Sequence, residues 1–155
     1  MITKLPYRLI LLISLFISSA CSVANSVPNT IQVTEWAQQV LMDSLNASYY
    51  DTPEDINSVQ KHYSLEAWRP MNSFFNNELK IIEQYKLSIH PIALTKPQLL
   101  PEPNCEYKLC WRVNQKFKLP ELNMIIDFSL LISRIIRSDA EYYLIQNLNM
   151  IVQRY

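Results

Sequence analysis

The sequence of 155 residues contains no glycine, although average usage of about 7% would give about eleven. Phosphate-binding loops, dinucleotide fingerprints and the nucleophile elbow of hydrolases all need glycine, because the backbone must reach positive φ or approach a ligand without a Cβ. The absence of glycine therefore excludes these kinds of site. With only two histidines, three cysteines and no HExxH motif, the usual zinc ligand sets are hard to assemble, and we expect neither a metal nor a cofactor.

Charge and hydrophobicity narrow the classes of partner. The 14 Lys and Arg balance 14 Asp and Glu, and charged residues make up 18% of the chain. A chain without net positive charge does not attract the phosphate backbone of nucleic acid, so we expect no nucleic-acid binding. Hydrophobic residues make up 49%, which is too many for a disordered tail and fits one compact domain.

Residues 1–24 have the pattern of a targeting segment. Lys4 and Arg8 precede an uncharged apolar run from residue 9 to residue 20, which as a helix would span about 18 Å of a hydrocarbon core about 30 Å thick. A secretory signal peptide therefore fits better than a transmembrane helix or a buried N-terminal helix; a short retained anchor is a further alternative. Removal of residues 1–24 leaves 12 Lys and Arg against 14 Asp and Glu, a net charge of −2.

Two processing sites compete within this segment. Cleavage after the small-x-small residues 22–24 would leave Asn25 as the N-terminus, whereas residues 18–21 resemble a lipoprotein box, with Ser18 where Leu is usual and Cys21 as the lipidated residue. We favour ordinary cleavage.

Cys105 and Cys110 are the thiols that either cleavage leaves available for pairing. In an oxidising compartment we expect them to form a structural disulfide that closes a six-residue loop and is worth about 2 kcal/mol. Two buried free thiols are the alternative.

After a linker over residues 25–32, the periodicity predicts helices. Apolar residues recur at helical spacing from Val33 to Tyr49. An N-cap hydroxyl, a proline and two acids at residues 52–55 predict a short helix that ends near His62. A third helical stretch covers residues 65–85, and Pro70 within it predicts a kink or the meeting of two helices.

From Lys86 onward the pattern changes to strands. Residues 86–94 read as a strand with an irregularity at Pro91, and residues 95–104, with three prolines, as an extended loop. Alternation over residues 111–119 and 122–132 predicts an antiparallel hairpin, and Leu144, Leu148, Met150 and Val152 continue the pattern. The helices therefore come first along the sequence and the strands follow. This order predicts an α+β fold, with a helical layer on the apolar face of a curved antiparallel sheet of about four strands.

Five surface residues are candidates for an interface. Arg112, Lys116 and Lys118 form a cationic stripe on one strand face, which could meet an anionic partner, although a solvated sheet face is the default interpretation. Tyr142 and Tyr143 could anchor a contact, because aromatic side chains dominate interface hot spots.

His90 and Asp127 are the polar pair most able to carry chemistry. If the two side chains met across the sheet, they could form a general acid–base pair. An isolated His and Asp in strands are more often structural residues, and we expect no catalytic residues.

Several short motifs occur in order over residues 33–155, and they are Trp36-Ala37, Tyr63-Ser64-Leu65-Glu66-Ala67-Trp68, Lys86-Leu87-Ser88-Ile89, Trp111-Arg112-Val113 and Leu130-Leu131-Ile132-Ser133-Arg134. Their order resembles that of the DotI/IcmL family of type IVB (Dot/Icm) secretion systems. The resemblance implies a periplasmic domain with a nuclear-transport-factor-like fold, acting as a non-enzymatic scaffold that contacts itself and other secretion subunits.

The N-terminus departs from the family pattern of a cytoplasmic stretch followed by a full transmembrane helix. The resemblance therefore implies a relative that is free in the periplasm or anchored to a membrane through its N-terminus, either as a component or as an accessory of the machine. A binding protein or enzyme for a small ligand, and a secreted virulence factor derived from the family, are the alternatives.

Overall fold

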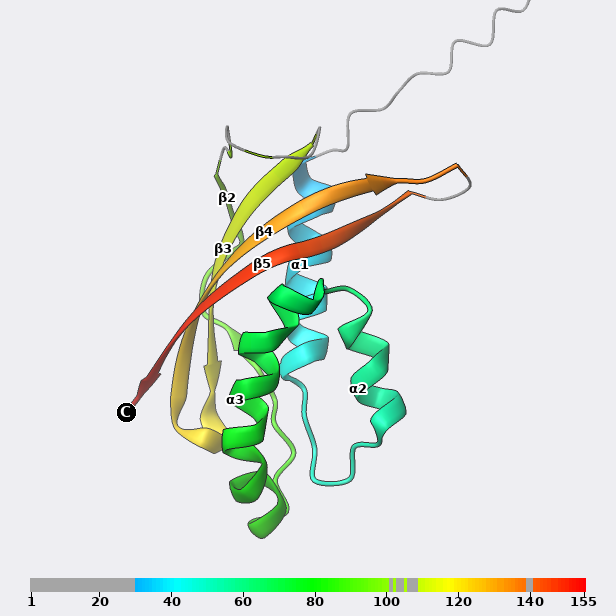
Figure 1. The fold of residues 1–155 in the computed structure, drawn as a ribbon. Helices are drawn as coiled ribbons and strands as arrows, with labels where there is room; N and C mark the ends of the chain where they lie inside the picture. Colours follow the sequence, from blue (N-terminus) through cyan, green and yellow to red (C-terminus); the bar gives the residue numbers. More distant parts are fainter. Residues whose placement is uncertain (1–29, 101, 103–104, 106–108, 139–140) are drawn as a thin grey trace, which may run out of the picture.

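The structure is a computed structural model that describes residues 30–155 except 101, 103–104, 106–108 and 139–140. Three helices come first along the chain and the strands follow (Figure 1), which confirms the predicted α+β order. The predicted signal segment, Cys21 and residues 25–29 of the linker lie outside the described residues. The elements are α1 (Thr30–Leu45), α2 (Pro53–Gln60), α3 (Leu65–Gln84), β1 (Ile92–Ala93), β2 (Gln98–Leu100), β3 (Cys110–Leu119), the 3₁₀ helix η1 (Pro120–Leu122), β4 (Met124–Ile136) and β5 (Glu141–Arg154).

The strands form one antiparallel sheet in the order β1-β3-β4-β5. Strands β1 and β2 both pair with β3, at opposite ends of it and on the side away from β4. The predicted β3–β4 hairpin is confirmed, with Leu119 opposite Met124. Its turn ends at Asn123, whose φ of 51° is left-handed; asparagine tolerates this conformation better than most residues, and here it stands where many chains would use glycine.

The predicted strand over residues 86–94 is mostly wrong, because the strand in this segment, β1, is limited to Ile92 and Ala93. Earlier in this segment, Ser88 instead bridges Ser48 after α1, and Pro91 has no backbone N–H to donate to a ladder. The segment that follows was predicted to be a loop, but it contains strand β2. The stretch from Gln98 to Leu100 is free of proline and pairs with the edge of β3.

Helix α1 buries the predicted apolar face, including Val33, Ala37 and Leu41. Helix α3 runs unbroken from Leu65 to Gln84 with Pro70 inside it, so the two-helix alternative is wrong. Pro70 is the sixth residue of the helix. The backbone hydrogen bond that it cannot make is therefore one near the start of the helix.

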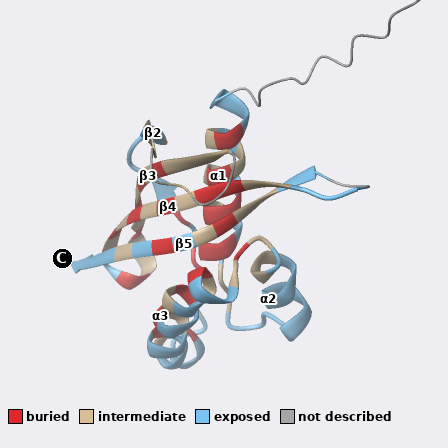
Figure 2. Ribbon diagram, turned by 45° about the horizontal axis from the view of Figure 1, so that its top comes forward, coloured by how far each residue is buried: buried red, intermediate tan, exposed pale blue. Residues whose placement is uncertain are grey.

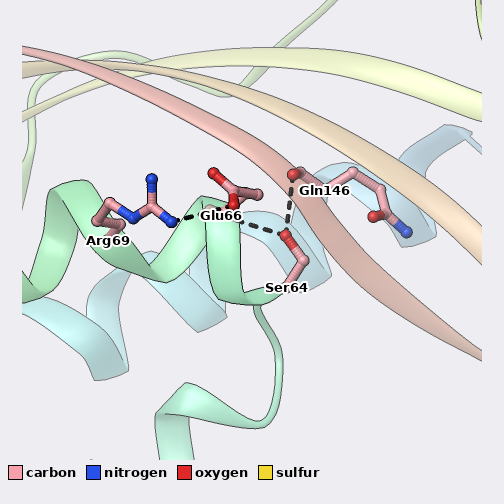
Figure 3. Close-up of polar contacts among 5 residues, drawn as sticks. Ser64, Glu66, Arg69 and Gln146 are labelled. Carbon is pink, nitrogen blue, oxygen red and sulfur yellow. Dashed lines mark hydrogen bonds and ion pairs between the residues drawn. The ribbon is translucent and has the colours of Figure 1, made fainter.

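The start of α3 is fixed to the outer edge of β5 (Figure 3). Ser64 Oγ accepts a hydrogen bond from Ala67 N at 3.1 Å and donates one to Gln146 O at 2.9 Å. Ser64 N donates to Ile145 O, and Ile145 N donates to His62 O. The segment before α3 therefore covers part of a sheet edge that would otherwise be open.

Strand β5 contains a bulge that reverses the predicted alternation. Leu131 pairs with Asn147, and the next residue of β4 pairs with Ile145, so Gln146 is the extra residue. Ile145 is fully buried beside Leu148, whereas Leu144, which the sequence placed on the apolar face, is only half-buried.

The core lies between α1, α3 and the apolar face of the sheet, where the strands carry alternating buried residues (Figure 2). None of the helices in the described part of the chain is both long and apolar enough to cross a bilayer. The largest fully buried side chains are Phe117, Leu41, Leu45, Met71, Ile82, Ile89, Leu119, Met124, Ile126, Leu130, Ile132 and Ile145.

Candidate interaction surfaces

The predicted cationic stripe lies on β3, on the sheet face opposite the core. Arg112 Nε lies 2.8 Å from Glu102 Oε2, and Lys116 Nζ lies 3.1 Å from Asp127 Oδ1 on β4. Strand pairing explains the second contact, because Lys116 and Asp127 are directly opposite each other in the hairpin. The stripe is therefore partly neutralised, and this sheet face carries both signs of charge.

Lys118, the third member of the stripe, has a different partner. Its Nζ lies 4.9 Å from the centre of the Tyr155 ring, which is within the range of a cation–π contact. Tyr155 itself is 60% exposed. This pair leaves a cation and an aromatic ring together at the surface.

The two adjacent tyrosines face different surroundings. The Tyr143 ring lies 5.4 Å from that of Trp36 and 6.0 Å from that of Trp111, so it belongs to an aromatic cluster. Burial raises the pKa of the Tyr143 hydroxyl. Tyr142 is exposed, and the Arg137 guanidinium lies 5.9 Å from its ring centre. Of the two, Tyr142 is the residue that a partner could reach.

A cleft of about 490 Å³ lies beside these tyrosines and is lined by Trp36, His62, Glu141 and both tyrosines, among others. Burial lowers the pKa of His62, and the nearby Lys61 lowers it further. Glu141 is paired with Arg134 across the hairpin. The cleft therefore holds an imidazole whose neutral form is favoured by burial and a carboxylate that is paired with an arginine.

His90 and Asp127 are not brought together. Nδ1 of His90 lies 3.0 Å from Glu121 Oε1, while Asp127 pairs with Lys116. The depression of about 400 Å³ on the outer sheet face is lined by Asp127 but not by His90. The acid–base interpretation fails on this geometry, because each side chain has a different partner.

Cys105 and Cys110 are joined by a disulfide, with their Cα atoms 6.2 Å apart. Cys110 is the first residue of β3, so the disulfide ties the preceding segment to the sheet. Among the residues that the structure describes, no group of three or more His, Cys, Asp or Glu side chains could hold a metal ion.

Sequence reasoning missed a buried carboxylate on α3. Glu78 is 4% exposed, and its Oε1 lies 2.6 Å from Arg154 Nη2 near the end of β5. Its Oε2 is buried without a hydrogen-bond partner. A glutamate within a helix ordinarily reads as a solvated residue, and no local signal pointed to a strand arginine 76 positions later.

Sequence reasoning also missed the apolar character of the free end of β5. Ile151 and Val152 are 64% and 39% exposed, close to Tyr155, and no further strand pairs with β5 in the described structure. The alternation placed Val152 on the apolar face but gave no sign that this end of the strand is exposed. An exposed sheet edge of this kind is a surface that other chains can join.

The fold class is defined by helices that pack on one apolar face of a curved antiparallel sheet. The sheet has an open edge strand, and the described residues do not assemble a reaction centre. In solved structures, the same fold occurs in an IcmL-like type IV secretion system protein from Legionella pneumophila subsp. pneumophila. That likeness has a TM-score of 0.63 at 12% sequence identity and covers 83% of this chain and 96% of the other. The periplasmic domain of DotI is similar with the same TM-score at 15% identity, covering 82% of this chain and 96% of its own.

These two likenesses agree with the motif resemblance over nearly the whole described chain, and at these identities they show a shared fold. No protein-family model matches the sequence, and a comparison with curated proteins finds no match.

Proposed function

We propose that this chain is a non-enzymatic component or accessory of a type IVB secretion system, acting in the periplasm through contacts with other subunits. The observation that supports the proposal is the fold shared with an IcmL-like secretion protein and with the DotI periplasmic domain, each matched over 96% of its length. The order of the sequence motifs supports it independently.

The proposal includes the domain limits and the route to the periplasm. Residues 33–155 are the periplasmic domain, and residues 1–24 direct export. Mass spectrometry of the protein from membrane and periplasmic fractions tests this step: Asn25 at the N-terminus supports cleavage, and a lipid on Cys21 supports an anchored form. An unprocessed Met1 would contradict both.

The outer sheet face contributes contacts in this proposal, through Arg112, Lys116 and Lys118, and Tyr142 contributes from β5. Of these side chains, Lys118 and Tyr142 are the best placed, because their described partners are aromatic or cationic groups rather than carboxylates. Lys118→Glu should weaken capture of secretion subunits in crosslinked cells, while Lys80→Glu, which changes an exposed lysine on α3, serves as the control.

Deletion of the gene in a bacterium with an active type IVB system tests the function itself. We expect translocation of a reporter substrate to fall and to recover on complementation. Unchanged translocation would overturn the role in the machine, and recovery of the protein in culture supernatant would favour a secreted factor instead.

A further inference from the structure

A groove of about 570 Å³ lies between α2 and α3, and we name it the α2–α3 groove. Helix α2 packs against α1 and buries none of its residues. Figure 2 shows that α2 is mostly exposed. The groove is therefore a surface feature beside the core and separate from the sheet faces described above.

Apolar side chains from three segments are exposed in the α2–α3 groove. Tyr49 follows α1, Ile56 belongs to α2 and Leu79 belongs to α3, and they are 45%, 47% and 43% exposed. Trp68 and Phe75 of α3 are half-buried and also line it. Large apolar side chains gathered at one exposed site mark an interaction surface rather than ordinary solvent exposure.

The same groove carries negative charge without compensation. Asp43, Asp51, Asp55 and Glu83 line it, and the described lining contains no Lys, Arg or His. The ion pairs of the described chain use other carboxylates. Asp51 and Asp55 accept hydrogen bonds from backbone N–H groups, at 2.7 and 2.9 Å, which hold the carboxylates without cancelling their charge.

We propose that the α2–α3 groove binds a cationic amphipathic α-helix of another protein. An apolar floor with an acidic rim is complementary to a helix that has one apolar face flanked by Lys or Arg, which is the helix-in-groove mode of recognition. The inference rests on the proposed role in protein contacts and specifies the chemistry of one partner.

None of the three helices described for this chain fits that partner, so the described part of a second copy does not supply it. Helices α1 and α2 contain no Lys or Arg. Helix α3 contains Arg69 and Lys80, and Arg69 already pairs with Glu66 in its own helix. The chain's own residues 1–8 carry Lys4 and Arg8, so the experiment must separate that segment from a partner.

The first test measures binding of a defined probe to the full chain. The probe is a fluorescent amphipathic peptide of about 18 Leu and Lys residues, long enough for about five helical turns. A matched peptide with Glu in place of Lys is the control. We expect the Lys peptide to bind more tightly by about tenfold or more, and its affinity to fall as salt is raised. Equal binding of both peptides would overturn the proposal.

Paired variants locate the site. Leu79→Ala with Glu83→Gln should weaken binding of the Lys peptide by about tenfold, because both side chains line the groove. Leu65→Ala with Glu35→Gln is the matched control, since Leu65 is 81% exposed and both residues lie outside the groove. The assignment would be overturned if both variant pairs weakened binding equally, or if neither pair weakened it.

A photo-crosslinking residue in place of Leu79 identifies the natural occupant in the cell. Capture of a segment of another protein that is helical, apolar on one face and rich in Lys or Arg supports the proposal. Capture of this chain's residues 1–8, of a second copy or of an acidic segment overturns it. These readouts do not involve translocation. Failure of the groove proposal would therefore leave the proposed secretion function standing, and failure of the deletion experiment would leave the binding result standing.

Discussion

Helices α2 and α3 begin alike but are held in place differently. Each has a hydroxyl at its N-cap that accepts a hydrogen bond from a backbone N–H of the first turn, Thr52 from Asp55 and Ser64 from Ala67. Helix α3 then buries an apolar face against the sheet, whereas α2 buries nothing. Equivalent local signals thus specify both helices, but tertiary burial locks only one of them.

The difference explains where a partner could bind. Helix α3 is part of the core and cannot move without disturbing the sheet. Helix α2 adds little to the core, so it can serve as one wall of the α2–α3 groove without a large cost in stability.

The largest expected effect is in the core. Phe117→Ala should lower the free energy of unfolding by about 3–5 kcal/mol, because Phe117 is fully buried and its ring packs against that of Phe128 at 6.0 Å. Ile56→Ala on α2 should change it by less than about 0.5 kcal/mol. Urea denaturation monitored by fluorescence measures both, and a comparable loss for Ile56→Ala would break the contrast.

The disulfide should give the next largest effect. Reduction, or Cys105→Ser with Cys110→Ser, should lower the free energy of unfolding by about 2 kcal/mol, through the entropy of the short loop in the unfolded chain. Denaturation with and without reductant gives the value. Hydrogen exchange in α2 should stay unchanged, and increased exchange there would show that α2 depends on this edge of the sheet.

Removal of the two caps compares the helices directly. Ser64→Ala removes the cap of α3 and the bond to Gln146 O, and should cost about 1–2 kcal/mol of global stability. Thr52→Ala should cost less than about 0.5 kcal/mol globally, because α2 can unwind without opening the core. Its effect should appear as faster amide exchange confined to α2. An equal global cost for the two caps would contradict the distinction.

The smallest effect is a local dependence on pH. Hydrogen bonds from the backbone and side chain of Thr52 lower the pKa of Asp55 below its usual 3.8. Because the folded-state pKa is the lower one, the contribution is complete above that usual value and is lost as the pH falls through the folded value. Amide exchange in α2, corrected for its intrinsic pH dependence, should show this loss of protection.

The matched control for that experiment is Asp55→Asn, which removes the titrating group. This variant should protect α2 less at neutral pH and show no further loss on acidification. If the loss of protection on acidification persisted in Asp55→Asn, it would have to come from another titrating group.

Local patterns predicted most of the framework. Periodicity and capping residues located the three helices of the described residues, and alternation located the β3–β4 hairpin. These signals depend on residues within a few positions of one another, so the sequence displays them directly.

Features that depend on distant residues could not be predicted. Strand β2 exists because β3 offers it an edge, and the bulge at Gln146 is defined only against β4. The partners of Arg112 and Glu78 come from other elements. For the α2–α3 groove, each acid reads alone as a solvated side chain, and only the fold gathers them beside exposed apolar residues.

The hydrogen bond between Ser64 and Gln146 joins residues 82 positions apart, and this has a consequence for the order of folding. As a chain is extended from its N-terminus, α1 and α3 exist before the strands that cover their apolar faces. Helix α3 acquires its anchor only when β5, the last strand, has been added. Closure of the core is therefore a late and long-range event, and an incomplete chain would present the same apolar faces to chaperones or to other unfinished chains.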